Sequence, residues 1–275
     1  IALFADRDAD SDGFTLRNST VYDNNDEGLR FYSGSDGLTI EDSTFYGNPD
    51  NATDDDDQDR GVYAESDQLT LRNSTFRDHS RWGVYAKDID QFLIENNTFE
   101  DNQDGGLWIL NGGVGSVRGN TAANNNDPIS NQGLGLDIGS HSGAVVENNI
   151  AYGHKQQGIE IFGAVTAQNN TAYDNRIGLR MIGRHGLLLD NTAYNNEYGF
   201  SGESSIYGIG TIEGNTAYGN STAGIWGNDS TIIRGNTVYD NALGVRSAYL
   251  VANNLIRDNT GIAVSLPSLN SRDRI

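Results

Sequence analysis

The sequence of 275 residues carries 18 lysines and arginines against 38 aspartates and glutamates, for a formal net charge of −20. Such a chain lacks the basic footprint that binding of phosphate backbones requires, so we expect no nucleic-acid partner. No apolar run approaches the roughly 20 residues that cross a bilayer as a helix, so we expect no membrane partner. The absence of cysteine excludes a disulfide framework and a thiolate metal site.

A short repeat runs through the whole chain. An asparagine or serine precedes a threonine or its equivalent, then an apolar residue, and often a tyrosine. The first residue of this motif recurs at positions 19, 43, 74, 97, 120, 149, 170, 191, 215, 236 and 254, with a median step of 23. A regular period of this length indicates a solenoid.

A second marker lies between these motifs, where a glycine is followed by alternating apolar residues, as in Gly106, Leu107, Trp108 and Ile109. Alternation with a period of two predicts strands. Two or three short strands per repeat, with Gly, Asn and Asp at the corners, make one coil. The sequence therefore predicts an all-β fold, a single-stranded right-handed parallel β-helix (solenoid) of about 11–12 coils, with residues 1–275 as one domain.

The repeat positions have predictable directions. We expect the apolar residue of each motif to point inward, and the Asn or Ser two residues earlier to form an inward ladder that satisfies corner backbone groups. The following position alternates among tyrosine, arginine and glutamate, so it faces solvent. We expect its tyrosines, among them Tyr173 and Tyr194, to form an external and mainly structural stack.

In chain order, Ile1, Ala2 and Leu3 fit the strand that follows a repeat glycine, with the glycine missing. We therefore expect the chain to be a fragment of a longer protein, most simply a monomer. An acidic cluster follows, and it begins like a calcium-binding loop although its twelfth position is a serine. Its candidate Ca²⁺ ligands are Asp8, Asp10 and Asp12. A second acidic run, at positions 54–57, is another loop candidate, with a solvated loop as the alternative for both.

The outward residues of the strands that follow the glycine trace one line along the solenoid. They are Arg30, Tyr63, Tyr85, Trp108, Asp137, Glu160, Arg180, Ser201, Trp226, Arg246 and Ala263. Aromatic rings can stack on sugars and charged groups can act on a bond, so this line is the predicted functional site. The predicted substrate-binding residues are Arg30, Tyr63, Tyr85, Trp108, Trp226 and Arg246. Insertions at 47–60 and 124–134 are expected to stand beside the line as functional loops.

The predicted chemistry centres on Asp137 and Glu160, which should lie one coil apart, at roughly 5 Å. Such a pair can share a proton or hold a cation. Arg180 follows one coil later and could anchor a substrate carboxylate. The candidates for proton transfer in the flanking turns are His141, His154 and Lys155. The alternative is a surface ladder of charges without catalytic function.

The chain resembles carbohydrate-binding and sugar-hydrolase β-helix repeats. Residues 147–154 and 158–161 look like the coils of secreted mannuronan C5-epimerases, which with the related alginate lyases act on polyuronates along a β-helix sheet. The epimerase motif Tyr-Gly-Phe-Asp-Pro-His-Glu corresponds to residues 134–140, where Gly135 and Asp137 match while the tyrosine and histidine do not. His141 lies two positions beyond the expected histidine.

The resemblance implies an extracellular or cell-surface protein that acts on an acidic, uronate-containing polysaccharide by C5 epimerisation or β-elimination. A Ca²⁺-assisted lyase would use Asp137 and Glu160 as ligands, with Arg180 or Lys155 as base, and the cation would offset the acidic surface. A glycoside hydrolase using the same carboxyl pair is a variant. The main alternative is a non-catalytic glycan-binding or structural module of a large surface protein, and a trimeric fibre is a further one.

Overall fold

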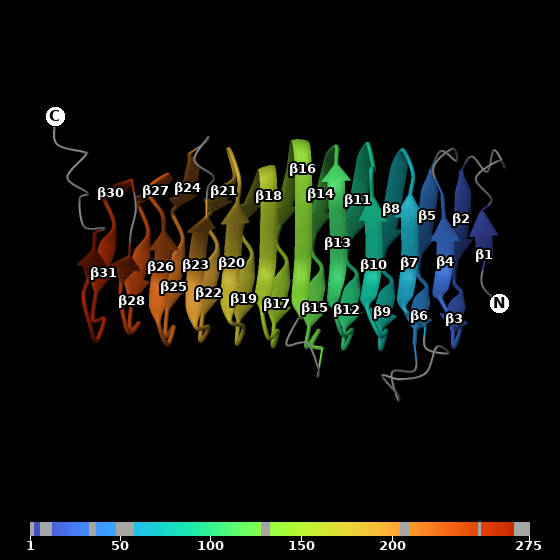
Figure 1. Cartoon of the computed structure of the whole chain (residues 1–275), viewed down its shortest axis with the longest axis horizontal. Helices are drawn as coiled ribbons and strands as arrows, with labels where there is room; N and C mark the ends of the chain where they lie inside the picture. The colour runs from blue at the N-terminus through green and yellow to red at the C-terminus, as the bar shows by residue number, and fades with distance from the viewer. Residues whose placement is uncertain are drawn as a thin grey trace.

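The computed structural model describes residues 3–5, 13–32, 37–47, 58–127, 133–203, 209–246 and 249–266. Within these ranges the chain forms 32 strands, which pair in parallel along two sheets. The same residues contain no helix that could cross a membrane. Figure 1 shows the coils stacked in one column, with β1 (Leu3–Ala5) and β31 (Leu255–Arg257) at opposite ends of it. The predicted all-β parallel solenoid is confirmed.

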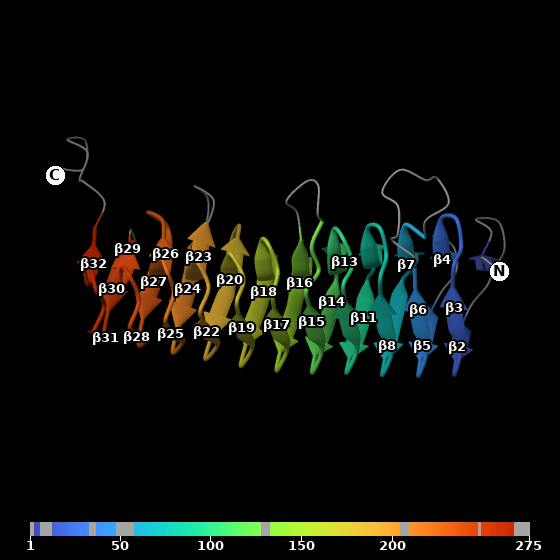
Figure 2. The ribbon, with the colours of Figure 1, turned by 90° about the horizontal axis from the view of Figure 1, so that it is seen from below.

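The coils have three faces, which we number in the order in which the chain forms them (Figure 2). The first face contains the strands that follow the repeat glycine. Its strands are β1, β4 (Glu27–Phe31), β7 (Arg60–Glu65), β10 (Trp82–Lys87), β13 (Gly105–Gly112), β16 (Leu134–Glu147), β18 (Gln157–Gln168), β20 (Ile177–Ile182), β23 (Tyr198–Glu203), β26 (Ala223–Gly227), β29 (Val245–Arg246) and β32 (Val264–Ser265).

The long strands β16 and β18 continue from the first face onto the second. The remaining strands of the second face are β2 (Phe14–Arg17), β5 (Leu38–Glu41), β8 (Gln68–Arg72), β11 (Gln91–Glu95), β14 (Val114–Arg118), β21 (Leu187–Leu189), β24 (Gly210–Glu213), β27 (Thr231–Arg234) and β30 (Leu250–Ala252).

The third face is a separate sheet of 11 three-residue strands. They are β3 (Thr20–Tyr22), β6 (Thr44–Tyr46), β9 (Thr75–Arg77), β12 (Thr98–Glu100), β15 (Thr121–Ala123), β17 (Ile150–Tyr152), β19 (Thr171–Tyr173), β22 (Thr192–Tyr194), β25 (Thr216–Tyr218), β28 (Thr237–Tyr239) and β31.

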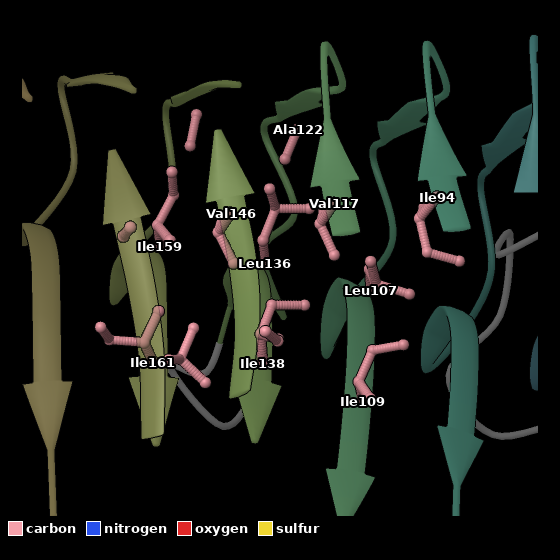
Figure 3. Close-up of a cluster of buried hydrophobic side chains, with 14 of the residues drawn as sticks. Ile94, Leu107, Ile109, Val117, Ala122, Leu136, Ile138, Val146, Ile159 and Ile161 are labelled. Atoms are coloured by element: carbon pink, nitrogen blue, oxygen red, sulfur yellow. The ribbon is translucent and has the colours of Figure 1, made fainter. Parts of the chain in front are cut away.

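The alternating apolar residues of all three faces meet inside the solenoid. Figure 3 shows one slice of this core, where Ile109, Ile138 and Ile161 of the first face meet Val117 and Val146 of the second. These side chains are fully buried, and each contributes about 1.5–3 kcal/mol to folding. The core is continuous along the coils, so the outward residues of the first face stand on a rigid base.

The predicted inward ladder is present at the corner before the third face. At Asn149, the side-chain oxygen accepts hydrogen bonds from the backbone and side-chain nitrogens of Asn120, both at 2.9 Å. Its amide donates to the carbonyl of Val117 and to the side-chain oxygen of Asn170, again at 2.9 Å. The preceding Asn148 has a φ of 56°, a left-handed conformation that asparagine tolerates and that turns the chain. The same arrangement continues from coil to coil and satisfies the corner backbone.

A second inward ladder, which we did not predict from the sequence, lies at the corner after the third face. Most rungs are hydrogen-bonded to the next, as when Asn175 donates from its backbone and side chain to Asn196, at 2.9 and 3.1 Å. Its rungs are Asn24, Gln58, His79, Asn102, Asn125, His154, Asn175, Asn196, Asn220, Asn241 and Asn259. Two histidines therefore occupy positions that asparagine holds in most coils.

The external tyrosine stack is also present on the third face. The rings of Tyr152, Tyr173, Tyr194, Tyr218 and Tyr239 lie 4.9 to 5.2 Å apart with interplanar angles of 5 to 9°. Each ring covers the face of its neighbour, which leaves mainly edges and hydroxyls for solvent. Arg257 extends the stack by placing its guanidinium 4.5 Å from the ring centre of Tyr239. This geometry agrees with a structural role.

Candidate functional site

The predicted outward line is a continuous row of paired residues on the first face, which we call the first-face row. Strand register pairs each member with the next. Its members are Arg30, Tyr63, Tyr85, Trp108, Asp137, Glu160, Arg180, Ser201, Trp226 and Arg246. The prediction that Ala263 is the last member is wrong. Arg246 pairs with Ser265 instead, because the register of the short final coil is displaced by two residues.

The aromatic part of the row offers ring edges at two of its three positions. The rings of Tyr63 and Tyr85 stack on each other, with centres 5.5 Å apart at an angle of 27°. The guanidinium of Arg60 lies 5.5 Å from the ring centre of Tyr85, within the range of a cation–π contact. Trp108 is turned by 71° to Tyr85, and it is the aromatic ring that borders Asp137.

Two carboxylates bind one cation near the centre of the row, and a third carboxyl lies one coil further along. Nη1 of Arg180 donates to Glu160 at 3.0 Å, and Nη2 donates to Glu203 at 2.5 Å. Asp137 is the register neighbour of Glu160, and it has no hydrogen bond or ion pair to any described residue. Arg180 therefore neutralises two carboxylates, while Asp137 is left without a partner among the residues that the structure describes.

Burial and charge act together on these groups. Burial raises the pKa of Asp137 well above its ordinary value, and the neighbouring Glu160 raises it further, against an opposing effect of Arg180. Burial also raises the pKa of Glu160, although Arg180 works against it. Since a neutral carboxyl can donate a hydrogen bond and a carboxylate cannot, Asp137 can act as a donor or an acid.

Asp137 faces a hollow of about 220 Å³ on the first face. Trp108 and Phe162 line its apolar sides, and Glu160 and His141 supply polar edges. His141 is exposed, and its Nε2 lies 3.4 Å from Oδ1 of Asn111, a long contact. An acid, an exposed imidazole and an aromatic ring thus converge on a space large enough for one sugar residue.

A second hollow, of about 320 Å³, lies on the other side of the Glu160 and Arg180 pair. It is lined by Gln157, Arg176, Ile177, Arg180, Tyr198, Ser201, Glu203 and Trp226. The rings of Tyr198 and Trp226 meet edge to face, 5.1 Å apart at 79°. Arg246 lies over the ring of Trp226 at 4.0 Å. The two hollows and the ion pairs between them form one extended surface with polar and aromatic groups.

The structure does not bring two of the predicted proton-transfer residues to the hollow beside Asp137. His154 is 2% exposed and is a rung of the second inward ladder, because its ring replaces the usual asparagine there. Lys155 is exposed, but its Nζ donates to the backbone oxygen of Asp127 at 2.7 Å, and it does not line either hollow. Of the three candidates, only His141 lies beside Asp137.

The predicted cationic ends of the row differ from each other. Arg30 is paired with Glu27 and, at 2.7 Å, with Asp26. Arg246 is exposed and has no ion pair to a described residue, so its guanidinium can meet an anionic group. The roles of both in binding stay predictions.

The candidate calcium ligands Asp8, Asp10 and Asp12 lie outside the described residues, as does the acidic run at 54–57. In the described ranges, no group of three or more His, Asp or Glu side chains is placed to hold a metal ion. A cation at Asp137 and Glu160 would therefore need further oxygen ligands from water or a substrate.

Phe162 and Glu203 were not predicted, although the sequence contained a signal for both. Each stands two residues after a member of the first-face row, on the same side of its strand. Period-two alternation therefore places both outward. A second outward row beside the first completes the hollows and supplies the second partner of Arg180.

These features define a parallel β-helix with an irregular, polar and aromatic row on one face. A family model described as "Right handed beta helix region" matches residues 8–167, 60–201 and 162–271. The chain therefore belongs to the right-handed β-helix family. A search of curated proteins found no match.

Two solved structures are similar to this chain in fold. The A-module of Azotobacter vinelandii mannuronan C-5 epimerase AlgE4 has a TM-score of 0.58 at 17% identity, over 92% of this chain and 79% of that one. The A. vinelandii AlgE6 A-module has a TM-score of 0.51 at 16% identity, over 89% and 78%. At such identities the likeness shows the fold alone.

Proposed function

We propose that the first-face row binds an extended acidic polysaccharide and that the hollow at Asp137 acts on it by β-elimination or C5 epimerisation. The observation that carries the proposal is Asp137 itself, a partly buried carboxyl with a raised pKa and no partner among the described residues, between Trp108 and His141. Perturbed acids in hollows are typical of catalytic sites. The fold that the chain shares with the two epimerase modules supports the proposal.

The chemistry follows from the protonation states. Neutral Asp137 donates a hydrogen bond to the uronate carboxylate, which draws charge from C5 as its proton leaves. His141 takes that proton. In β-elimination the electron pair forms the C4–C5 double bond, the C4–O bond breaks, and the leaving oxygen receives the proton that His141 has taken. In epimerisation a water on the opposite side gives a proton to C5, the proton on His141 returns to solvent, and no bond to oxygen breaks.

The rest of the row positions the chain. Trp108 offers a ring to the sugar beside Asp137, and Arg246, which has no ion pair to a described residue, offers its guanidinium to a uronate carboxylate further along. Arg180 is engaged by Glu160 and Glu203, so we assign it to holding these carboxylates in place. In this proposal Ca²⁺ would reduce the repulsion between substrate carboxylates and the acidic surface, and the protein works outside the cell or at its surface.

Incubation of the protein with alginate and with pectin, each with and without Ca²⁺, tests the proposal. The expected result is either ultraviolet absorbance of an unsaturated product or a change in the uronate NMR signals, and both should disappear in the His141→Asn variant. Tyr194→Phe on the third face is the matched control and should keep full activity. Turnover by neither measure, or full turnover by His141→Asn, would overturn the proposed chemistry.

One observation favours a non-catalytic alternative. Arg180, the cation expected to meet a substrate carboxylate, is already paired on both sides. A glycan-binding module would need only Trp108, Trp226 and Arg246 for contact. Binding of an oligosaccharide without any turnover, lost in Trp108→Ala, would identify this second function.

A further inference from the structure

The second inward ladder contains two buried histidines among amides. His79 is 0% and His154 2% exposed. Burial lowers the pKa of each imidazole from its ordinary value of 6.5 to about 4. Neither belongs to the proposed chemistry, and histidine is the side chain whose charge changes in the physiological range. The position of His154 links this property to the candidate site.

Both ring nitrogens of His154 are used in its neutral form. Nδ1 accepts a hydrogen bond from the backbone nitrogen of Asn125 at 3.1 Å, and Nε2 lies 3.2 Å from the carbonyl oxygen of Ala122, to which it donates. An asparagine rung accepts the corresponding backbone bond through its amide oxygen, as Asn125 does from the backbone N–H of Asn102. An amide oxygen does not titrate, whereas Nδ1 does.

Protonation of Nδ1 removes that acceptor and leaves Nδ1 only the carbonyl oxygen of Asn125, 3.4 Å away, to donate to. The backbone N–H of Asn125 then faces a second N–H and loses its partner inside a buried corner, which favours movement of one of them. The charged residues of the stacked turns, Asp127, Lys155, Asp174 and Arg176, are exposed or partly exposed. None of them contributes to the pKa of His154, which burial lowers and two backbone hydrogen bonds raise.

The same imidazole touches the strand that carries the site. A Cβ atom on Gly135 would lie only 2.7 Å from Nε2 of His154, so the ring rests directly against the backbone of β16. Asp137 follows two residues later. The turn that contains His154 is also hydrogen-bonded to Asn126, whose side chain donates to the carbonyl of Gly153 at 2.8 Å. Movement of this turn therefore acts on the segment that leads into Asp137.

We propose that His154 is an acid-sensitive latch: a proton on its imidazole breaks the bond to Asn125 and opens the start of β16, and this switches the Asp137 site off at low pH. The switching of activity rests on the proposed function, whereas the opening is a property of the protein alone. His79 shares the burial but lies at the aromatic end of the row, beside Gly61, where its Nδ1 contacts Asn102 at 2.7 Å. It therefore serves as an internal comparison.

Hydrogen exchange followed by NMR, without substrate and corrected for intrinsic rates, tests the latch. If the open state titrates at 6.5 and the closed state at about 4, the opening constant of Asn125 and residues 134–138 should rise about 30-fold between pH 7.5 and pH 5. His154→Asn, which restores the regular rung, should abolish this rise. His79→Asn and His141→Asn should leave it unchanged.

An equal rise in His154→Asn would overturn the proposal. If that variant does not fold, the ring signals of the wild-type protein decide. They should titrate near pH 4 together with loss of protection at residues 134–138. Titration near pH 6.5 with protection intact would overturn the latch. Because no step uses a glycan, failure here is distinguishable from failure of the proposed function.

Discussion

The third face and the first face arise from the same repeat but differ in how strictly they keep it. On the third face, the sequence Thr-Ala-Tyr recurs in β19, β22 and β25, and the rings stack at a constant spacing. On the first face, the outward residue changes at nearly every coil. The regular positions satisfy backbone groups and fill the core, and the irregular ones are free to carry chemistry.

The two faces also differ in how well their polar groups are satisfied. In the ladder beside the third face, Asn149 makes hydrogen bonds on all sides. On the first face, Asp137 has no partner among the described residues. Functional sites commonly break local rules that the rest of a protein keeps. The following predictions test this contrast, from the largest effect to the smallest.

The largest effect is expected for loss of the proposed base. His141→Asn should lower turnover of a uronate polysaccharide about 100- to 10,000-fold, the usual range for a general base, without changing stability by more than about 0.5 kcal/mol. Steady-state rates and urea unfolding measure the two. The paired control is His185→Asn, an exposed histidine outside both hollows. Equal loss of activity in both variants would contradict a specific role for His141.

The second effect concerns the ladder. Asn149→Ala should lower the free energy of unfolding by about 3 kcal/mol, because the backbone N–H of Asn120 and the carbonyl of Val117 lose their partner in a buried corner. Urea denaturation measures it. Tyr152→Phe in the same coil, on the outside, should change stability by less than about 0.5 kcal/mol. A ladder variant as stable as this control would refute the structural role of the amides.

The third effect concerns binding. Trp108→Ala should weaken binding of an acidic oligosaccharide about tenfold, or about 1.4 kcal/mol, as expected for one aromatic contact. Calorimetry measures the affinity. Tyr194→Ala removes a ring from the third face and should leave affinity unchanged. If both substitutions weaken binding equally, the third face also takes part and the contrast between the faces fails.

The smallest effect concerns the free energy of unfolding, which the ionised form of Asp137 lowers. Its raised pKa means that folding favours the neutral form, so this group stabilises the fold at low pH, and that contribution is lost as pH rises through the folded pKa. An asparagine side chain cannot ionise, so the Asp137→Asn variant should be more stable than the wild type, with a gap that widens as pH rises above the ordinary carboxyl pKa of 3.8. Thermal unfolding measures this gap, and a gap that narrows with pH would show that the pKa of the carboxyl is not raised.

Much of the fold was predictable because each coil repeats the same local rule. The inward apolar position, the first ladder and the outward row follow from period-two alternation anchored at glycine and asparagine. The second ladder was not predicted because two of its rungs are histidines and one is a glutamine. These three residues interrupt the regular spacing of asparagines in the sequence. The residue type of His154 suggested a role in proton transfer. In the structure it is instead a buried, hydrogen-bonded rung of the second ladder.

The sequence by itself determined the parallel β-helix and the order of residues along the first-face row, since both depend on spacing within one strand and between repeats. Only the tertiary structure decided which groups pair. It pairs Arg180 with Glu160 and Glu203, and it buries His154. It places Asp137 beside Trp108 and His141 without an ion pair to any residue that it describes. Pairing and burial depend on side-chain directions in neighbouring coils, about 5 Å apart in space but roughly 20 or more residues apart in sequence.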